Sequence, residues 1–317
     1  MSMNLIKRGF TLMLLAFLGY TASAQTMAEA GEAFNQAISK METDVDGAIL
    51  GFRNTIAISE KLGDEGMDLK MKSSQIIPGL YLKKSNNLYK AKDLAGAITA
   101  GEEAIKASTE FNDEKVKAQA TNLVSQFYMV QANGKLKTKD YDGAISEFNR
   151  SLELNPSLTK SLLGLMIVYK EKEDVPNMEA TLERLNAVGA ATDDASKAKS
   201  ILQSHLLAIG AKALQGNNNE VAVENITKSL TFGESADAYY YLTAANNKLQ
   251  KWDAAIEAAN KGIALEQKDK NRFYFELGTA YAGKGDSDNA CTNFKLVKAG
   301  PNLKSAQYQV KTVLKCK

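Results

Sequence analysis

The sequence is poor in the residues that build catalytic and metal sites. Its 317 residues include two cysteines, one histidine, one tryptophan and four prolines. The histidine, His205, precedes Leu206 and Leu207 in an amphipathic stretch, which is typical of a structural or solvated side chain. One histidine and two distant cysteines give no zinc-ligand spacing. We therefore expect no metal site and no cofactor.

The motifs of nucleotide binding and acyl transfer are also absent. The sequence has no phosphate-binding loop, no G-x-G-x-x-G after an expected strand and no G-x-S-x-G nucleophile elbow. Acidic residues are plentiful, but they are spread over the expected helix surfaces and form no pair in an apolar context. We expect a protein that is not an enzyme.

Neither sign of charge is in large excess. The chain has 39 basic and 37 acidic residues, and two of the basic ones lie in the first 24 residues. Such a balance gives no electrostatic reason to bind nucleic acid or an anionic membrane surface. One local bias exists, because residues 295–317 hold six lysines and no acidic residue. We interpret this bias as the solvated face of a terminal helix, with a binding patch as the alternative.

An apolar run of notable length occurs at the amino terminus. A basic start is followed by the apolar run Phe10–Leu18 and by small residues up to Ala24. This pattern predicts a signal peptide over residues 1–24, with an uncleaved anchor as the alternative. The run is too short to span a bilayer comfortably, so we expect no integral membrane span after cleavage. We expect an exported protein, with the periplasm favoured over a secreted or envelope-associated location.

The rest of the sequence carries a repeated helical pattern, which is clearest in residues 271–304. Leu277 and Tyr281 are four residues apart and share one helix face, and Ala290 and Phe294 do the same on a second helix. Neither helix can bury its apolar stripe alone. Such helix pairs must therefore stack on one another.

Weaker copies of this pattern extend back to about Glu29. Three of the intervals between copies are roughly ten to fifteen residues longer than the 34-residue unit. The three inserts are Gly63–Ile77, Phe111–Val124 and Thr192–Leu202, and none contains proline. Because they are rich in Ala, Lys, Gln, Asp and Glu, we expect them to form extra helical turns and not loops.

The units resemble the tetratricopeptide repeat, whose pattern is a large residue, Leu-Gly, Tyr, Ala, Phe, Ala and Pro. The resemblance covers roughly residues 29–304 and implies an all-α, right-handed superhelical solenoid of stacked antiparallel helix pairs. We expect about seven repeats in residues 25–302, or alternatively two blocks with a seam near 188–200. Residues 303–317 are expected to form a capping helix, because the exposed end of a repeat array must be covered.

Both cysteines lie near the carboxyl end. Cys291 opens the second helix of the last repeat, and Cys316 ends the expected capping helix. In an oxidising compartment two cysteines readily form a disulfide, which here would attach the cap to the array. Two separate thiols are the alternative.

The resemblance also implies a binding surface, because the first helix of each pair lines a concave groove in tetratricopeptide arrays. In this chain the corresponding positions carry amide and aromatic side chains. Amides can bond a peptide backbone, and aromatic rings can anchor a side chain. The candidate groove residues are Asn86, Tyr89, Met129, Asn133, Lys170, Tyr240, Asn247 and Phe275.

We therefore expect a non-enzymatic scaffold of the cell envelope that binds a protein or peptide segment in its groove. Two alternatives stay open. One is a structural protein that self-associates into homo-oligomers through the ends or convex faces of the array. The other is a carbohydrate-binding or hydrolytic protein that uses the groove as a cleft.

Overall fold

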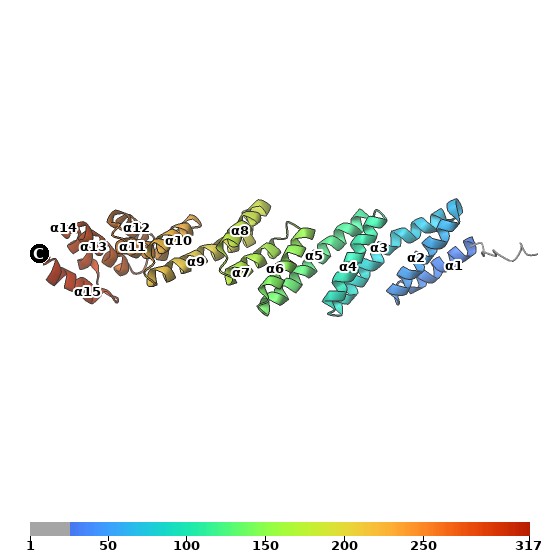
Figure 1. Cartoon of the computed structure of the whole chain (residues 1–317), viewed down its shortest axis with the longest axis horizontal. Helices are drawn as coiled ribbons and strands as arrows, with labels where there is room; N and C mark the ends of the chain where they lie inside the picture. Colours follow the sequence, from blue (N-terminus) through green and yellow to red (C-terminus); the bar gives the residue numbers. More distant parts are fainter. Residues whose placement is uncertain (1–25) are drawn as a thin grey trace, which may run out of the picture. The chain divides into compact units, whose positions relative to one another are not determined.

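The computed structural model describes residues 26–317, which are helical apart from short turns (Figure 1). The expected signal peptide, residues 1–24, lies outside the described residues. The chain divides into two compact units, Met1–Phe127 and Tyr128–Lys317, which we describe separately. Within residues 26–317, no helix is long and apolar enough to cross a membrane.

The first unit contains two helix pairs and the first part of α5, the helix that opens the third pair. Its core joins α2 to α3 through Phe52 and Ile77, both fully buried. Its described elements are α1 (Met27–Lys40), α2 (Val45–Lys61), the 3-10 turn η1 (Gly63–Gly66), α3 (Met67–Lys90), α4 (Leu94–Glu110) and the beginning of α5 (Glu114–Lys137).

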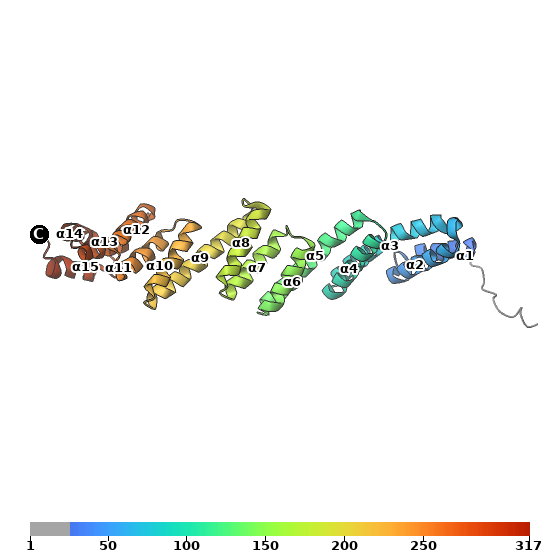
Figure 2. The same cartoon turned by 45° about the horizontal axis from the view of Figure 1, so that its top comes forward.

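The second unit continues the series of pairs from within α5, and Figure 2 shows them following one another in chain order. The first helices of its pairs also contact one another, α7 with α9, α9 with α11 and α11 with α13. These four helices form one continuous layer, which we call the first-helix layer. The elements are α6 (Tyr141–Leu154), α7 (Thr159–Glu171), α8 (Val175–Gly189), α9 (Asp193–Gln215), α10 (Asn219–Thr231), α11 (Ala236–Lys248), α12 (Trp252–Leu265), α13 (Asn271–Lys284), α14 (Ser287–Leu296), α15 (Leu303–Tyr308) and the π-helical turn η2 (Gln309–Val313).

The three inserts lengthen the first helices of their pairs. Helices α3, α5 and α9 have 24, 24 and 23 residues, whereas α7, α11 and α13 have 13, 13 and 14. The prediction of extra helical turns is confirmed, and only Gly63–Gly66 forms a separate 3-10 turn. The boundary between the two units falls inside α5, whereas residues 188–200 lie within the second unit, where α8 contacts α9.

In six of the described pairs, the turn between the two helices has the same backbone conformation. After the first helix, a single residue adopts positive φ, and the next N–H closes a Schellman bond, as from Asp93 to the carbonyl of Leu88 at 2.9 Å. The positive-φ residue is glycine in one turn of the six. In the other five turns it carries a side chain, for which the left-handed conformation costs about 1–2 kcal/mol. The six residues are Lys92, Lys139, Glu173, Asn217, Gln250 and Gly285.

The pairs pack through large side chains placed over glycines. A Cβ on Gly164 of α7 would lie 2.2 Å from the ring of Phe148 on α6, and one on Gly278 of α13 would lie 2.8 Å from the ring of Phe294 on α14. Both phenylalanines are buried. The first contact joins successive pairs and the second joins the helices of one pair.

The carboxyl end closes the last pair. Ala306 of α15 is buried against Phe294 and Val297, and Val310 adds to this cluster from the π-helical turn. Cys291 on α14 forms a disulfide with Cys316, which follows the turn.

We predict that Gly164→Ala destabilises the second unit by about 1–3 kcal/mol, because the added methyl group displaces the Phe148 ring. The measurement is the midpoint of urea unfolding. Gly134→Ala on α5 is the control, because a Cβ there meets no atom within 4 Å, and a gain of about 0.5–1 kcal/mol is expected. A gain of stability from Gly164→Ala would contradict the close packing.

We predict that Cys316→Ser loosens the cap locally. The disulfide closes a loop with a sequence separation of 25, and a loop of that size is stabilised by roughly 3 kcal/mol on entropy grounds. Hydrogen exchange of the α15 amides should therefore accelerate, while α2 in the first unit stays unchanged. Equal protection of α15 in both forms would show that packing alone holds the cap.

Candidate functional site

Each unit has a hollow between two first helices. In the first unit a hollow of about 320 Å³ lies between α3 and α5 and is lined mainly by amide side chains. The candidate Asn86 is among them, and its Nδ2 already donates to the carbonyl of Leu82 at 3.0 Å. The lining residues are Leu82, Asn86, Gln119, Asn122, Leu123 and Gln126.

In the second unit a larger hollow of about 530 Å³ lies between α7 and α9. A hydrogen bond of 2.7 Å from Thr159 Oγ1 to Asp194 Oδ2 ties the starts of the two helices together. An apolar floor with a polar rim is the usual character of a site that holds an anchor side chain. Here the floor is Leu163, Ile167 and Ile201, and the rim is Ser196, Lys197 and Ser200.

Both hollows are lined largely by insert residues. Gln119, Asn122 and Leu123 belong to the insert in α5, and the four α9 residues of the larger hollow belong to the insert Thr192–Leu202. Helix α9 has 23 residues and the first helix before it, α7, has 13. The hollow lies where the additional residues of α9 run beside α7. The extra helical turns therefore supply at least half of the residues that line each hollow.

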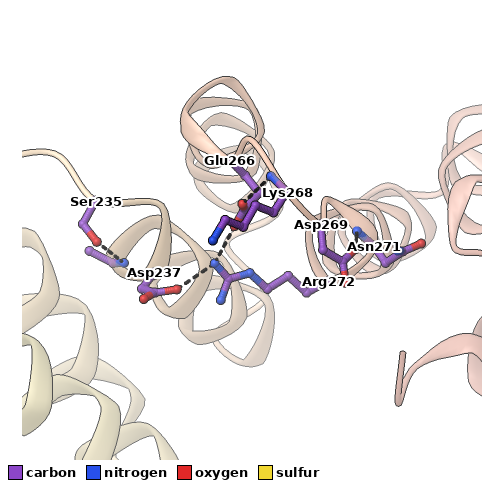
Figure 3. Close-up of polar contacts among 8 residues, drawn as sticks. Ser235, Asp237, Glu266, Lys268, Asp269, Asn271 and Arg272 are labelled. Carbon is purple, nitrogen blue, oxygen red and sulfur yellow. Dashed lines mark hydrogen bonds and ion pairs between the residues drawn. The ribbon is translucent and has the colours of Figure 1, made fainter. Parts of the chain in front are cut away.

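Farther along the first-helix layer, Arg272 of α13 links three helices (Figure 3). Its Nη2 lies 2.7 Å from Asp237 Oδ1 on α11 and 3.0 Å from Glu266 Oε2 at the end of α12. Its guanidinium carbon is 4.9 Å from the ring centroid of Tyr240 and 5.1 Å from that of Phe273. Arg272 thus fixes the position of Tyr240 in the layer.

Glu266 is held in its ionised form at this junction. The backbone N–H of Lys268 donates to Glu266 Oε1 at 2.9 Å and is the largest cause that lowers the pKa of this carboxyl. Partial desolvation opposes the shift, and Arg272 adds to it. Figure 3 also shows the adjacent bond from the Asn271 N–H to Asp269, 2.9 Å long, at the start of α13.

A second junction lies at the end of α11. Asn247 is 8% exposed, and its Nδ2 donates to both the backbone carbonyl and the carboxylate of Glu276, at 2.9 and 2.8 Å. Burial raises the pKa of the Glu276 carboxyl, and the Asn247 bond opposes the shift. Next to it, Lys248 Nζ donates to Asn217 Oδ1 at 3.0 Å. Asn247 and Lys248 therefore connect neighbouring repeats, and Asn247 is engaged inside the array.

The other candidate residues divide between core and surface. Phe275 packs edge-on against Phe294 at 5.7 Å, and Met129 packs against the large core of the second unit, so both have their apolar area in the protein. Tyr240 is half-buried against Phe273. Exposed residues remain, and each has an internal contact: Tyr89 stacks on Phe127 at 4.6 Å, Asn133 Nδ2 bonds the Met129 carbonyl at 2.9 Å, and Lys170 pairs with Glu171 at 3.5 Å.

The comparisons with known proteins find similar solved structures only. No family model and no curated protein matches the sequence. Among solved structures, MamA is 25% identical, with 59% of this chain and 94% of that chain covered and a TM-score of 0.35. YrrB, described as a TPR protein with an unusual peptide-binding site, is 15% identical, with 59% and 88% covered and a TM-score of 0.33. A tetratricopeptide repeat protein from Parabacteroides merdae ATCC 43184 is 12% identical, with 89% and 97% covered and a TM-score of 0.27.

Because these TM-scores lie below 0.5, we transfer no binding property from them. Seven consecutive helix pairs in residues 26–317 define the architecture, six of them with the same turn, and several contacts place aromatic rings over glycines. The chain has the tetratricopeptide-repeat fold. Within this fold, the sequence reasoning missed the hollow between α7 and α9, because the standard groove positions do not reach the insert. The spacing of Leu163 and Ile167 beside the insert was the available signal.

The described residues offer little for other chemistry. In residues 26–317, no three His, Cys, Asp or Glu side chains form a group that could hold a metal ion. His205 has a buried Nε2 without a hydrogen bond, and burial lowers the pKa of its imidazole. The geometry of the two hollows is suited to binding.

We predict that Glu276→Gln raises the thermal midpoint at pH 7. Because the folded pKa of Glu276 lies above its ordinary value of 4.5, ionisation destabilises the fold as pH rises through that value, and the penalty is complete above the folded pKa. Glutamine does not ionise and still accepts the Asn247 bond. The two proteins should therefore converge below about pH 4.

Glu266→Gln provides a control of opposite sign. The pKa of Glu266 is lowered in the folded protein, so its ionised form stabilises the fold above the unfolded pKa, and this contribution is lost as pH falls through the folded pKa. The variant should be less stable than the parent at pH 7 and should approach it in acid. If both variants changed the thermal midpoint at pH 7 in the same direction, the opposite pKa shifts of Glu276 and Glu266 would be contradicted.

Proposed function

We propose that the protein is a scaffold that binds a segment of another protein on the first-helix layer of the second unit. The observation that carries the proposal is the hollow between α7 and α9, with its floor of Leu163, Ile167 and Ile201. An apolar floor on a helical surface takes up a large apolar side chain, while the hydroxyl groups of Ser196 and Ser200 are placed to bond polar groups beside it.

The lining favours binding over catalysis. Among the described residues, Lys197 is the only ionisable side chain that lines this hollow, so no described acid and base face one another across it. Its polar groups are few and lie at the rim. A protein side chain that enters the hollow would meet hydrocarbon below and hydroxyl groups at the edge, which is the arrangement of an anchor site.

The hollow of the first unit supports a second contact on the same chain. Gln119 and Gln126 are exposed there, beside Asn86. Amide groups both donate and accept hydrogen bonds, so this surface suits the backbone of an extended segment. Two binding surfaces on one chain raise the effective concentration of a partner that engages both.

We also propose that the protein is exported to the periplasm. The signal pattern in residues 1–24 supports this location. The disulfide between Cys291 and Cys316 supports an oxidising compartment.

We predict that Ile167→Asp abolishes partner binding in the second unit. A photo-crosslinking residue at Ser200, on the rim, should capture a discrete partner in the native envelope. Placing a carboxylate on the floor should lower the cross-linked yield by at least about ten-fold, since the anchor loses roughly 1.5–3 kcal/mol of apolar burial.

Val221→Asp on α10 is the matched control, because Val221 is 45% exposed and does not line the hollow. Circular dichroism should show both variants folded. Unchanged cross-linked products with Ile167→Asp would refute the hollow as the binding site, and equal losses with both variants would point to an effect on folding.

A further inference from the structure

The outer face of the carboxyl-terminal cap carries positive charge without a counter-charge. Lys304, Tyr308 and Lys311 follow one another along α15 and the π-helical turn at helical spacing, and all three are exposed. Neither these two lysines nor Lys315 forms an ion pair within residues 26–317. Residues 295–317 hold six lysines and no acidic side chain, so no carboxylate side chain of the cap faces Lys304, Lys311 or Lys315.

The opposite charge gathers on the first elements of the first unit. Glu29 and Glu32 lie on α1, and Asp64 and Glu65 lie in η1, which contacts α1. None of these four carboxylates forms an ion pair within the described chain. We call this set of residues the acidic edge.

Both faces also expose large apolar side chains. Next to the acidic edge, Met27 is 40% exposed and Met67 is 58% exposed. On the cap, Tyr308 is 59% exposed and Val313 is 52% exposed. Apolar side chains ringed by charge of one sign are typical of surfaces that bind another protein.

We propose that the protein associates with a second copy of itself, with the basic cap of one copy docked on the acidic edge of the next. The argument is charge complementarity. Residues 26–68 contain nine acidic and three basic residues, whereas residues 295–317 contain six basic and no acidic residues. Four of the nine acids pair with lysines of α3, which leaves the four carboxylates of the acidic edge and Asp44 for a partner. The interface uses different faces of the two copies. Successive copies therefore form a ring if the rotation that relates them closes, and an open chain if it does not.

This mode of association depends on ionic strength. The charged groups are exposed, and screening at about 0.5 M salt shortens their range to a few ångströms, from roughly 10 Å at 0.1 M. The average mass in sedimentation velocity should rise with protein concentration at low salt. At about 0.5 M NaCl the association should weaken at least about ten-fold.

Charge reversal tests the pairing of the two faces. The chain from Gln25 onward retains every described residue, and its cap variant is Lys304→Glu, Lys311→Glu and Lys315→Glu. Its edge variant is Glu32→Lys, Asp64→Lys and Glu65→Lys. Each variant alone should be monomeric. Mixed, they should form complexes, because the unchanged edge of one meets the unchanged cap of the other, and one chain with all six changes should associate again.

The matched control has the same change of net charge at exposed lysines of the second unit away from the cap, Lys199→Glu, Lys212→Glu and Lys268→Glu. It should associate like the parent chain. The proposal is overturned by a parent chain that stays monomeric at every concentration in low salt, by association that the cap variant retains, or by failure of the mixed variants to form complexes. A compaction that is independent of concentration would also overturn it, because it would mean that the two faces pair within one chain.

Discussion

The structure depends on one kind of contact, a large side chain of one helix resting on a residue without a side chain on its neighbour. Phe148 over Gly164, Phe273 over Gly262 and Phe294 over Gly278 are three instances, and in each a Cβ on the glycine would lie within 3 Å of the ring. These contacts fix how closely helices approach within and between pairs, and they bury apolar stripes that no single pair can bury. The residues that make the repeat recognisable are therefore the least available for a partner.

What remains for binding lies where the regular repeat is interrupted. Residues of the insert in α5 and of the insert Thr192–Leu202 in α9 supply at least half of the lining of the two hollows, and the insert Gly63–Ile77 supplies Asp64 and Glu65 of the acidic edge. Extra turns on a first helix add surface that the next pair does not cover.

The sequence predicted the helix pairs, the helical inserts and the closing element at the carboxyl end, because these follow from periodicity and from the absence of helix breakers. It could not assign the polar side chains of the layer. Asn247 was expected in the groove, but it bonds to Glu276 of the next first helix. Arg272 likewise bonds to Asp237 and Glu266 of neighbouring helices. Such links depend on how far apart successive pairs lie, and that distance is a result of packing that a single sequence does not contain.

The last repeat of an array must be covered so that further repeats do not stack on it. The charge of the covering element then affects which protein surfaces can approach it. In the association proposed above, the lysines of the cap repel another cap and the carboxylates near Met27 repel another edge of the same kind, which disfavours contacts between like ends. The Cys291–Cys316 bond adds to this selectivity, because it holds the cap on α14 and so limits the freedom that α15 loses on docking. The cap therefore covers the core of its own array. In the proposed association, its charge also favours one contact with a second copy, the contact with the acidic edge.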